Sequence, residues 1–480
     1  MVIRVPAQIT IPDHYFLKPA DVIVERVGDM ARAVDRHGNV IAQSSDHAYV
    51  IQEAIDYLSA LGGGKIVLGN GEFEMKRTVR ISSGEFLIEG MGIDKTIIKT
   101  AQDVTIDNPF TVNTNTIIRN MTFDSNGNST YALAMVIYKS ETDKIIDYII
   151  LDNVKLVQSA KGKILWSLWD QTQQYNIKTV VFRNVLTIGV NDNSLDNGGA
   201  SFVETWIIDS CKFIDSPRIN SYVVKRTFIA NSEFNPSAHP ATSLIKDGAG
   251  LLYVINTRFV EAVELHRGTV FILNSEIYNN SLNIRPSGSL KVIVGWSYIE
   301  SARTIAFYDD ISKLDSLILI GNYIKPTEYD LFVSYTVGGT EINNVYIIGN
   351  VIDESEATHH FTSFNGNILN RWVEAYNLFP SGRKGFWNTS FGDEYTVKHN
   401  IGYKTENSGT ATFSGDGTTT QFKIAHGLVK TPSKVKVTPA SADAAGDFYV
   451  TVDTTYIYVN YLTAPPSGTD NVVLYWEAEV

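Results

Sequence analysis

The 480-residue sequence predicts an all-β protein dominated by a parallel β-solenoid. Three observations predict this fold. Short apolar segments recur from residue 65 onwards with almost no helical periodicity. Ten of these segments align on one Asn, Ser or Gly, at intervals of 18 to 33 residues. An interval near 25 residues fits one solenoid coil and is shorter than the roughly 40–50 residues of a propeller blade.

One helix is predicted before the solenoid. Asp46 can cap its N-terminus, and apolar residues at helical spacing run from Val50 to Leu61 before Gly62-Gly63-Gly64 ends the helix. A solenoid exposes core and strand edges at its ends, and these need cover. We therefore expect this helix to cap the N-terminal end, with residues 1–45 as a separate cap or attachment segment.

The aligned column has a physical reason. A coil bends sharply between two strands, and one residue at the bend often needs the left-handed backbone conformation, which Gly and Asn tolerate best. Apolar residues two positions before and three positions after the column predict two stacked core layers. Asn side chains stacked about 4.8 Å apart are expected to hydrogen-bond along the ladder. The column is Asn120, Asn153, Asn184, Ser210, Asn231, Asn256, Asn274, Gly295, Gly321 and Gly349.

The composition changes near residue 405. A stretch rich in Gly, Ser and Thr precedes SKVKVTPA, DFYVTVD, TYIYVNYL and NVVLYWEAEV, which alternate with period two and are separated by Pro and Gly turn signals. The sequence therefore predicts the solenoid over 46–405 and an antiparallel β-sandwich domain over 406–480.

Charge and cysteine content narrow the function classes. Lys and Arg number 40 against 52 Asp and Glu, a net charge of −12, which argues against nucleic-acid binding. Cys211 is the one cysteine, so no intrachain disulfide is expected, and its apolar strand places it in the core. No apolar run is long enough for membrane insertion, and the N-terminus lacks the features of a signal peptide.

Two segments carry a family resemblance. Ile51-Gln52-Glu53-Ala54-Ile55-Asp56 and Gly62-Gly63-Gly64 resemble the opening of pectate-lyase-superfamily right-handed β-helices, which include many bacteriophage tailspikes. Gly69 and Phe73 stand where the family motif has Pro and Tyr. The C-terminal segment resembles distal β domains of viral tail fibres. The resemblance implies a right-handed parallel β-helix and a location in a virion tail or on a cell surface.

Charged and aromatic residues follow the strand before each aligned segment. We align Ile245, Leu265, Ile284 and Phe307 as equivalent positions on successive coils. The charged and aromatic side chains that follow them then lie close together, where they suit contacts with sugar hydroxyls and carboxylates. A solvent-exposed ion-pair ladder is the alternative. The predicted catalytic residues are Glu264, His266, Asp247 and Asp309, and the predicted substrate-binding residues are Lys246, Arg267, Arg285, Tyr308, Trp166 and Trp169.

A second hypothesis places a carboxylate column at Asp215, Glu261 and Glu300, with neighbours about 9.6 Å apart, near the upper limit for an inverting glycosidase. The structural preference of turns for Asp is the alternative. Other aromatics, such as Trp206 and Trp296, have rings that can stack on sugar faces, but strand aromatics of this kind are expected mainly in the core. The sequence contains no GxxxxGK, HExxH or CxxC motif, so neither a metal nor a cofactor is expected.

Several functions fit one scaffold, because lyases, hydrolases, epimerases and non-catalytic adhesins share it. The first hypothesis is a tailspike-like protein that binds and depolymerises a surface polysaccharide. The second is a non-catalytic adhesin or receptor-binding fibre, and the third a structural surface protein. Within catalysis, the negative net charge favours a glycoside hydrolase slightly over a lyase, whereas the cluster of Lys246, His266, Arg267 and Arg285 favours binding of a uronate.

Side-chain alternation predicts a homotrimer. If residues two before the column face the core, those one and three before face outwards. The residues three positions before the column, the first being Ile117 and the last Tyr346, are all apolar or aromatic. The residues one position before the column are charged in the first four coils and mostly aliphatic from Ala230 onwards. Stacked aliphatics need cover, either from loops of the chain or from other subunits. A three-fold bundle of parallel solenoids would bury them.

Overall fold

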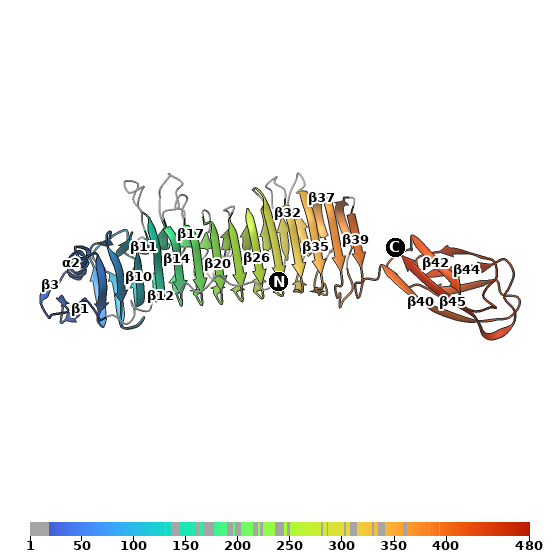
Figure 1. Ribbon diagram of the computed structural model, residues 1–480, viewed down its shortest axis with the longest axis horizontal. Helices are drawn as coiled ribbons and strands as arrows, with labels where there is room; N and C mark the ends of the chain where they lie inside the picture. The colour runs from blue at the N-terminus through green and yellow to red at the C-terminus, as the bar shows by residue number, and fades with distance from the viewer. Residues whose placement is uncertain are drawn as a thin grey trace.

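The computed structural model shows a long solenoid followed by a separate β-sandwich (Figure 1). The described residues are 19–129, 131–135, 145–158, 163–167, 177–189, 195–196, 203–214, 219–220, 224–235, 244–246, 250–279, 282–285, 287–301, 304–307, 314–328, 331–334, 341–358, 362–383, 385–392 and 394–480.

Each coil contributes strands to three parallel sheets, and each strand pairs with its equivalent in the next coil, as in Ile272↔Val294↔Leu319↔Ile347. This confirms the parallel β-helix. Sheet one contains β4 (Gly63–Leu68), β7 (Glu85–Glu89), β10 (Thr116–Asp124), β12 (Ile146–Gln158), β14 (Ile177–Arg183), β17 (Val203–Asp209), β20 (Arg226–Ala230), β23 (Leu251–Ile255), β26 (Gly268–Leu273), β29 (Leu290–Gly295), β32 (Leu314–Ile320), β35 (Glu341–Ile348), the end of β37 (Thr362–Ala375) and β39 (Glu394–Lys398).

Sheets two and three complete the coils. Sheet two contains β5 (Gly71–Met75), β8 (Thr96–Thr100), the ends of β10 and β12, β15 (Leu186–Gly189), β18 (Lys212–Ile214), β21 (Glu233–Asn235), β24 (Arg258–Phe259), β27 (Glu276–Asn279), β30 (Tyr298–Ser301), β33 (Tyr323–Pro326) and β36 (Val351–Ile352). Sheet three contains β6 (Val79–Ile81), β9 (Phe110–Val112), β11 (Tyr131–Met135), β13 (Lys163–Ser167), β16 (Leu195–Asp196), β19 (Ile219–Asn220), β22 (Leu244–Lys246), β25 (Val263–Leu265), β28 (Leu282–Ile284), β31 (Ile305–Phe307), β34 (Phe332–Ser334), the start of β37 and β38 (Phe386–Phe391).

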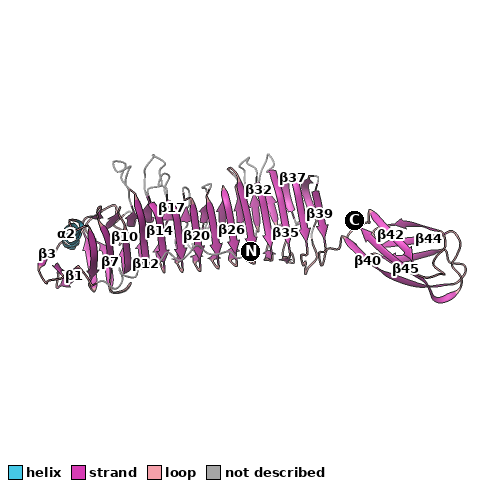
Figure 2. Cartoon of the chain, viewed as in Figure 1, coloured by secondary structure: helices cyan, strands magenta, loops and turns pink. Residues whose placement is uncertain are grey.

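The N-terminal end carries the predicted helix, α2 (His47–Ser59), which Figure 2 shows in cyan at the tip of the solenoid. The Asp46 carboxylate accepts a hydrogen bond from Tyr49 N at 3.0 Å and so caps the helix. The helix stops two residues earlier than predicted, which leaves Leu61 68% exposed. Three antiparallel strands, β1 (Val22–Val27), β2 (Met30–Asp35) and β3 (Val40–Ser44), precede it, and β1 pairs in parallel with β4.

The left-handed column is confirmed at nine of its ten predicted positions, with φ between 46° and 66°. The exception is Gly295, which lies inside β29 opposite Leu273 and Ile320. Trp296, with φ 51°, takes the left-handed position instead. Val294 and Ile299 therefore fill the two core layers in this coil, rather than Ile293 and Tyr298. Two further coils continue the column through Tyr376 and His399, at φ 59° and 56°.

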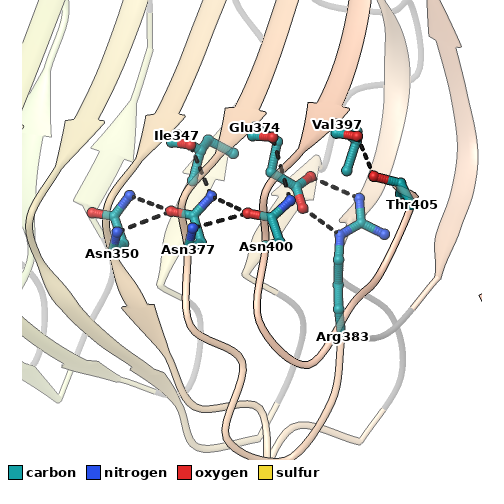
Figure 3. Close-up of polar contacts among 8 residues, drawn as sticks. All are labelled: Ile347, Asn350, Glu374, Asn377, Arg383, Val397, Asn400 and Thr405. Carbon is teal, nitrogen blue, oxygen red and sulfur yellow. Dashed lines mark hydrogen bonds and ion pairs between the residues drawn. The ribbon is translucent and has the colours of Figure 1, made fainter. Parts of the chain in front are cut away.

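The residue after each left-handed residue faces inwards and forms a second, buried ladder. In the C-terminal coils these residues are Asn322, Asn350, Asn377 and Asn400, all at most 6% exposed. Each Oδ1 of the last three accepts the backbone N–H of the preceding ladder residue at 2.9 Å and its Nδ2 at 3.0 Å. Figure 3 shows the steps between Asn350, Asn377 and Asn400. Hydrogen-bonded Asn side chains were predicted in the left-handed column, where Asn153 Nδ2 donates to Asn120 Oδ1 at 2.8 Å. The inner ladder was not predicted.

The outward face of sheet one changes along the solenoid. Leu87, Ile117, Ile150 and Val181 pack into a small cluster and are 1% to 8% exposed. From Phe228 onwards the same column is partly exposed, and Phe228, Tyr253 and Phe271 stack with ring centroids 5.6 and 4.6 Å apart. The single chain therefore covers the N-terminal part of this apolar column and leaves its C-terminal part accessible.

The C-terminal domain is a sandwich of two three-stranded antiparallel sheets. One consists of β40 (Glu406–Gly415), β45 (Gly468–Glu479) and β42 (Lys434–Pro439), the other of β41 (Gln421–Ala425), β44 (Tyr456–Tyr461) and β43 (Phe448–Val452). Residues such as Ile457, Val459, Val472 and Leu474 are fully buried between them. This confirms the predicted antiparallel sandwich.

Candidate functional site

The candidate site lies on the outer face of sheet three, on β25 and β28. Val263 and Leu265 are fully buried in the core, so alternation turns Glu264 between them to the outer face. Glu264 pairs with Asn283 on the next coil. Two adjacent coils therefore present a carboxylate and a carboxamide side by side.

His266 and Arg285 complete a charged cluster around Glu264. His266 Nε2 lies 2.8 Å from Glu264 Oε1, and Arg285 Nε lies 3.6 Å from the same oxygen. The side chains of Glu264 and His266 are only 12% and 16% exposed, whereas Arg285 is 39% exposed. Arg285 N donates to Leu265 O at 2.8 Å, which fixes Arg285 against the strand that carries Glu264. The structure thus brings together three of the predicted site residues.

Asn283 is a site residue that the sequence reasoning missed. Asn283 is 8% exposed, and its Oδ1 is inaccessible to solvent and has no hydrogen-bond partner among the described residues. An unpaired buried oxygen is costly unless a donor reaches it. The available signal was the register: a polar residue between Leu282 and Ile284, directly opposite Glu264.

Arg267 points along the solenoid towards the next coil. Its Nε donates to Ser287 Oγ at 2.9 Å, and its Cγ and Cδ lie 3.4 and 3.2 Å from the position of a β-carbon on Gly288. Glycine at 288 therefore leaves room for the Arg267 side chain. Arg267 extends the polar surface of the Glu264 cluster by one coil.

One predicted alignment is wrong by one residue. Leu265, Ile284 and Phe307 pair as expected, but Lys246 pairs with Leu265 where Ile245 was expected. Lys246 therefore does not share a column with His266. Trp166 lies in β13 opposite Ala134, but its side chain and that of Lys246 are outside the description. Asp247, Tyr308, Asp309 and Trp169 lie outside the described residues.

The second hypothesis, the carboxylate column, is wrong where it can be described. Phe259, Ile277 and Ile299 are paired on three successive coils. Glu261 lies two residues after Phe259, whereas Glu300 lies one residue after Ile299. The two carboxylates therefore do not occupy equivalent positions. Glu300 accepts the Tyr298 hydroxyl at 2.6 Å, which lowers the pKa of Glu300, and pairs with Lys325 at 3.2 Å. Asp215 lies outside the described residues.

The two other tryptophans differ in burial. Trp206 is 5% exposed and packs edge-on against Phe182 at 5.5 Å, as expected for a core aromatic. Trp296 is 63% exposed, so its expected place in the core is wrong. The physical reason is its left-handed backbone, which turns the indole away from the core.

The cluster of Glu264, His266, Arg285 and Asn283 offers hydrogen-bond donors and acceptors together. A guanidinium suits carboxylates and hydroxyls, and the Glu264–His266 pair has the residue types of proton transfer. Within the described ranges, no three His, Cys, Asp or Glu side chains could hold a metal ion. The described part of the chain has no helix that is long and apolar enough to cross a membrane.

Comparisons with known proteins were made on the sequence and on the structure. No family model and no curated protein matches the chain. Among solved structures, a tailspike mutant of E. coli bacteriophage HK620 in complex with a pentasaccharide has 13% identity and a TM-score of 0.48, over 93% of this chain and 92% of that one.

Two further structures show the same degree of likeness. The Gp54 tailspike of Acinetobacter baumannii bacteriophage AP22, in complex with a capsular saccharide, has 11% identity and a TM-score of 0.43, over 91% and 94% of the two chains. The A-module of a mannuronan C-5 epimerase from Azotobacter vinelandii has 13% identity and a TM-score of 0.38, over 74% and 95%. The parallel β-helix itself is established by the strand pairings of this chain.

Proposed function

We propose that this protein binds a polysaccharide on the outer face of sheet three and that Glu264, His266 and Arg285 contact it. The observation that carries the proposal is the charged cluster itself: His266 Nε2 and Arg285 Nε lie 2.8 and 3.6 Å from Glu264 Oε1, and all three side chains stay partly exposed on the outer face of adjacent coils.

A glycan fits this cluster because its hydroxyl groups both donate and accept hydrogen bonds. Glu264 supplies acceptors on one coil, and Arg285 supplies donors on the next. Successive coils repeat about every 4.8 Å, so a polymer that crosses them meets a new set of side chains at each step. A virion tail or an extracellular surface, which the resemblance to tailspikes implies, is the proposed location.

Depolymerisation is the second candidate function, favoured by the 2.8 Å contact between Glu264 and His266. Elimination from a uronate needs a base for the C5 proton and a cation beside the carboxylate, roles open to His266 and Arg285. The C4–O bond then breaks, and the departing sugar oxygen takes a proton. Hydrolysis by paired acids needs a second carboxylate, which the sequence placed at Asp247 or Asp309.

A panel of capsular and O-antigen polysaccharides tests both functions. Wild-type protein is measured for binding, for release of reducing ends and for the ultraviolet absorbance of an unsaturated uronate. Reducing ends with absorbance indicate a lyase, reducing ends alone a hydrolase, and binding alone an adhesin. Glu264→Gln and His266→Ala should weaken binding at least fivefold, whereas Glu72→Gln, a half-exposed carboxylate paired with Lys99 at 3.4 Å, should not. Unchanged binding in both site variants would exclude this cluster.

We further propose that the protein assembles as a homotrimer through the C-terminal half of sheet one. The supporting observation is the partly exposed apolar face formed by Phe228, Tyr253, Phe271, Ile318 and Ile320. Soluble monomers rarely expose large contiguous apolar patches, so another subunit is the expected cover.

A further inference from the structure

An open groove of about 480 Å³ runs along the corner between sheet one and sheet two. We call it the corner groove. Its lining includes the left-handed residues Asn231, Asn256 and Asn274 and the sheet-two residues Glu233, Arg258 and Glu276. This volume is within the range of small-ligand sites. The corner groove lies at a different corner of the coil from the Glu264 cluster, which is on sheet three.

Polar groups repeat along the corner groove from coil to coil. Asn256 Nδ2 donates to Asn231 Oδ1 at 2.8 Å, and Asn231 Nδ2 donates to Asp209 Oδ1 at 2.9 Å. Arg258 lies 3.6 Å from Glu276, and both side chains are about half exposed. The walls thus offer amide, carboxylate and guanidinium groups in a row, held at the spacing of the coils.

The coil that follows the lined part of the corner groove carries an exposed indole. Trp296 takes the left-handed position on the coil after Asn274 and is 63% exposed. A β-carbon on Gly321, the left-handed residue of the following coil, would lie 3.0 Å from Trp296 Cδ1, so the indole extends over this glycine. The space that the ring occupies therefore depends on glycine at 321.

A second aromatic follows along the same corner. Gly349, the next left-handed residue, has no atom within 4 Å of its missing side chain, and Tyr376 comes after it. Tyr376 is 65% exposed, and its ring stacks on His399 with centroids 4.9 Å apart. Trp296 and Tyr376 are three coils apart, about 14 Å along the axis, with only glycines between them in this column.

Trp296 and Tyr376 both have a left-handed backbone conformation, which is unusual for aromatic residues. A bulky residue with positive φ is an outlier, and such strain persists mainly where function requires the side chain. Six other coils fill this position with Asn, at φ 46° to 59°, and so avoid the strain. At Trp296 and Tyr376 the chain instead has large rings that project into solvent and add little to the core.

We propose that the corner groove and the coils beyond it form a second saccharide-binding site, in which the polar walls of the groove bind hydroxyl groups and Trp296 and Tyr376, on those further coils, stack on the apolar faces of sugar rings. The class of ligand rests on the proposed function; the site is new. Separate aromatic rings among polar groups match an amphipathic sugar chain. A second copy of this chain would instead require a contiguous apolar surface, which is the outward face of sheet one.

The test uses Trp296→Asn and Tyr376→Asn in the full-length protein, because Asn is native to this position in other coils. Binding to the immobilised polysaccharide panel and the melting temperature Tm are both measured. We expect each variant to bind at least fivefold more weakly, with Tm unchanged or raised. Tyr449→Asn, which removes a 58% exposed tyrosine from the C-terminal sandwich, is the control and should bind as wild type does.

The outcomes separate the two proposed sites. If both Asn variants bind as wild type does, or lose affinity together with a large drop in Tm, the corner-groove site is wrong and the rings serve packing. If the Asn variants weaken binding while neither Glu264→Gln nor His266→Ala does, the corner groove is supported and the Glu264 cluster is refuted. If wild-type protein binds no member of the panel, both proposals fail.

Discussion

Arg383 and Glu374 form a two-point ion pair that is completely buried near the C-terminal end of the solenoid. Arg383 Nε lies 2.8 Å from Glu374 Oε1, and Nη2 donates to Oε2 at 2.8 Å (Figure 3). Burial raises the pKa of Glu374, and the Arg383 charge opposes this shift. Asn400 Nδ2 donates to Glu374 O at 3.3 Å, so the ion pair adjoins the last step of the inner Asn ladder.

Removing one partner of this pair should destabilise the solenoid strongly. Arg383→Met leaves an uncompensated buried carboxylate, for which about 3–5 kcal/mol of lost unfolding free energy is expected. The double variant Arg383→Met with Glu374→Gln should recover a large part of this loss, because no charge remains buried. Urea unfolding followed by circular dichroism measures both. A double variant no more stable than Arg383→Met would contradict this explanation.

The inner ladder gives a second stability prediction. Asn377 Oδ1 accepts Asn350 N at 2.9 Å, and Asn377 Nδ2 donates to Ile347 O at 2.9 Å. Asn377→Ala leaves the Asn350 amide unpaired in the core, which is expected to cost about 1–3 kcal/mol. The exposed Asn370, which donates to Asn343 Oδ1 at 3.1 Å, is the matched control. Equal losses for Asn370→Ala and Asn377→Ala in urea unfolding would show that the ladder has no special role.

The fold was largely predictable because one backbone requirement recurs in every coil. Left-handed turns select Asn and Gly, and these residues revealed the coil spacing. The same logic failed at Gly295, because a glycine next to Trp296 is the expected choice for positive φ, yet the chain places the tryptophan there. Tyr376 was missed for the same reason, because tyrosine does not indicate a left-handed turn; His399 is of a type enriched there, but it lies one coil beyond Tyr376, outside the aligned segments.

The candidate site was predictable only in part, because its register depends on loop lengths between coils. Glu264, His266 and Arg285 were grouped correctly by the apolar pattern of β25 and β28. The coils from Lys246 to Leu265 and from Leu265 to Ile284 both span 19 residues, but the apolar Ile245 was a plausible match for Leu265, and the alignment slipped by one residue. Burial of Asn283 depends on three-dimensional packing that no local pattern reports.

The N-terminal cap should lose stability as the pH falls from 7 to 5. His47 is 4% exposed; its Nδ1 accepts Glu74 N at 2.9 Å, and its Nε2 lies 3.2 Å from Asp29 O. Burial is the main cause that lowers the pKa of His47 below its ordinary 6.5. The unfolded chain then binds the proton first, so the stability is complete above about pH 6.5 and decreases below it.

Hydrogen exchange of the amides in α2 and β5 measures this effect. Their protection should decrease at the lower pH, after correction for intrinsic exchange, and His47→Gln should abolish the dependence. His37, which is exposed, provides the control, since His37→Gln should retain the wild-type dependence. A His37 variant that removes the dependence would refute the assignment to His47.

The apolar face of sheet one predicts a trimer that one charge can disrupt. Ile320 is partly exposed on this face, opposite Gly295 and Ile348 on the neighbouring coils. An aspartate at position 320 would be solvated in a monomer, but it would be a buried unpaired charge in a dry subunit interface. Light scattering should give about three times the 53.3 kDa chain mass for wild type and a lower mass for Ile320→Asp. Asp152→Asn, on the charged half of sheet one, should leave the mass unchanged. A wild-type mass of one chain would refute the trimer.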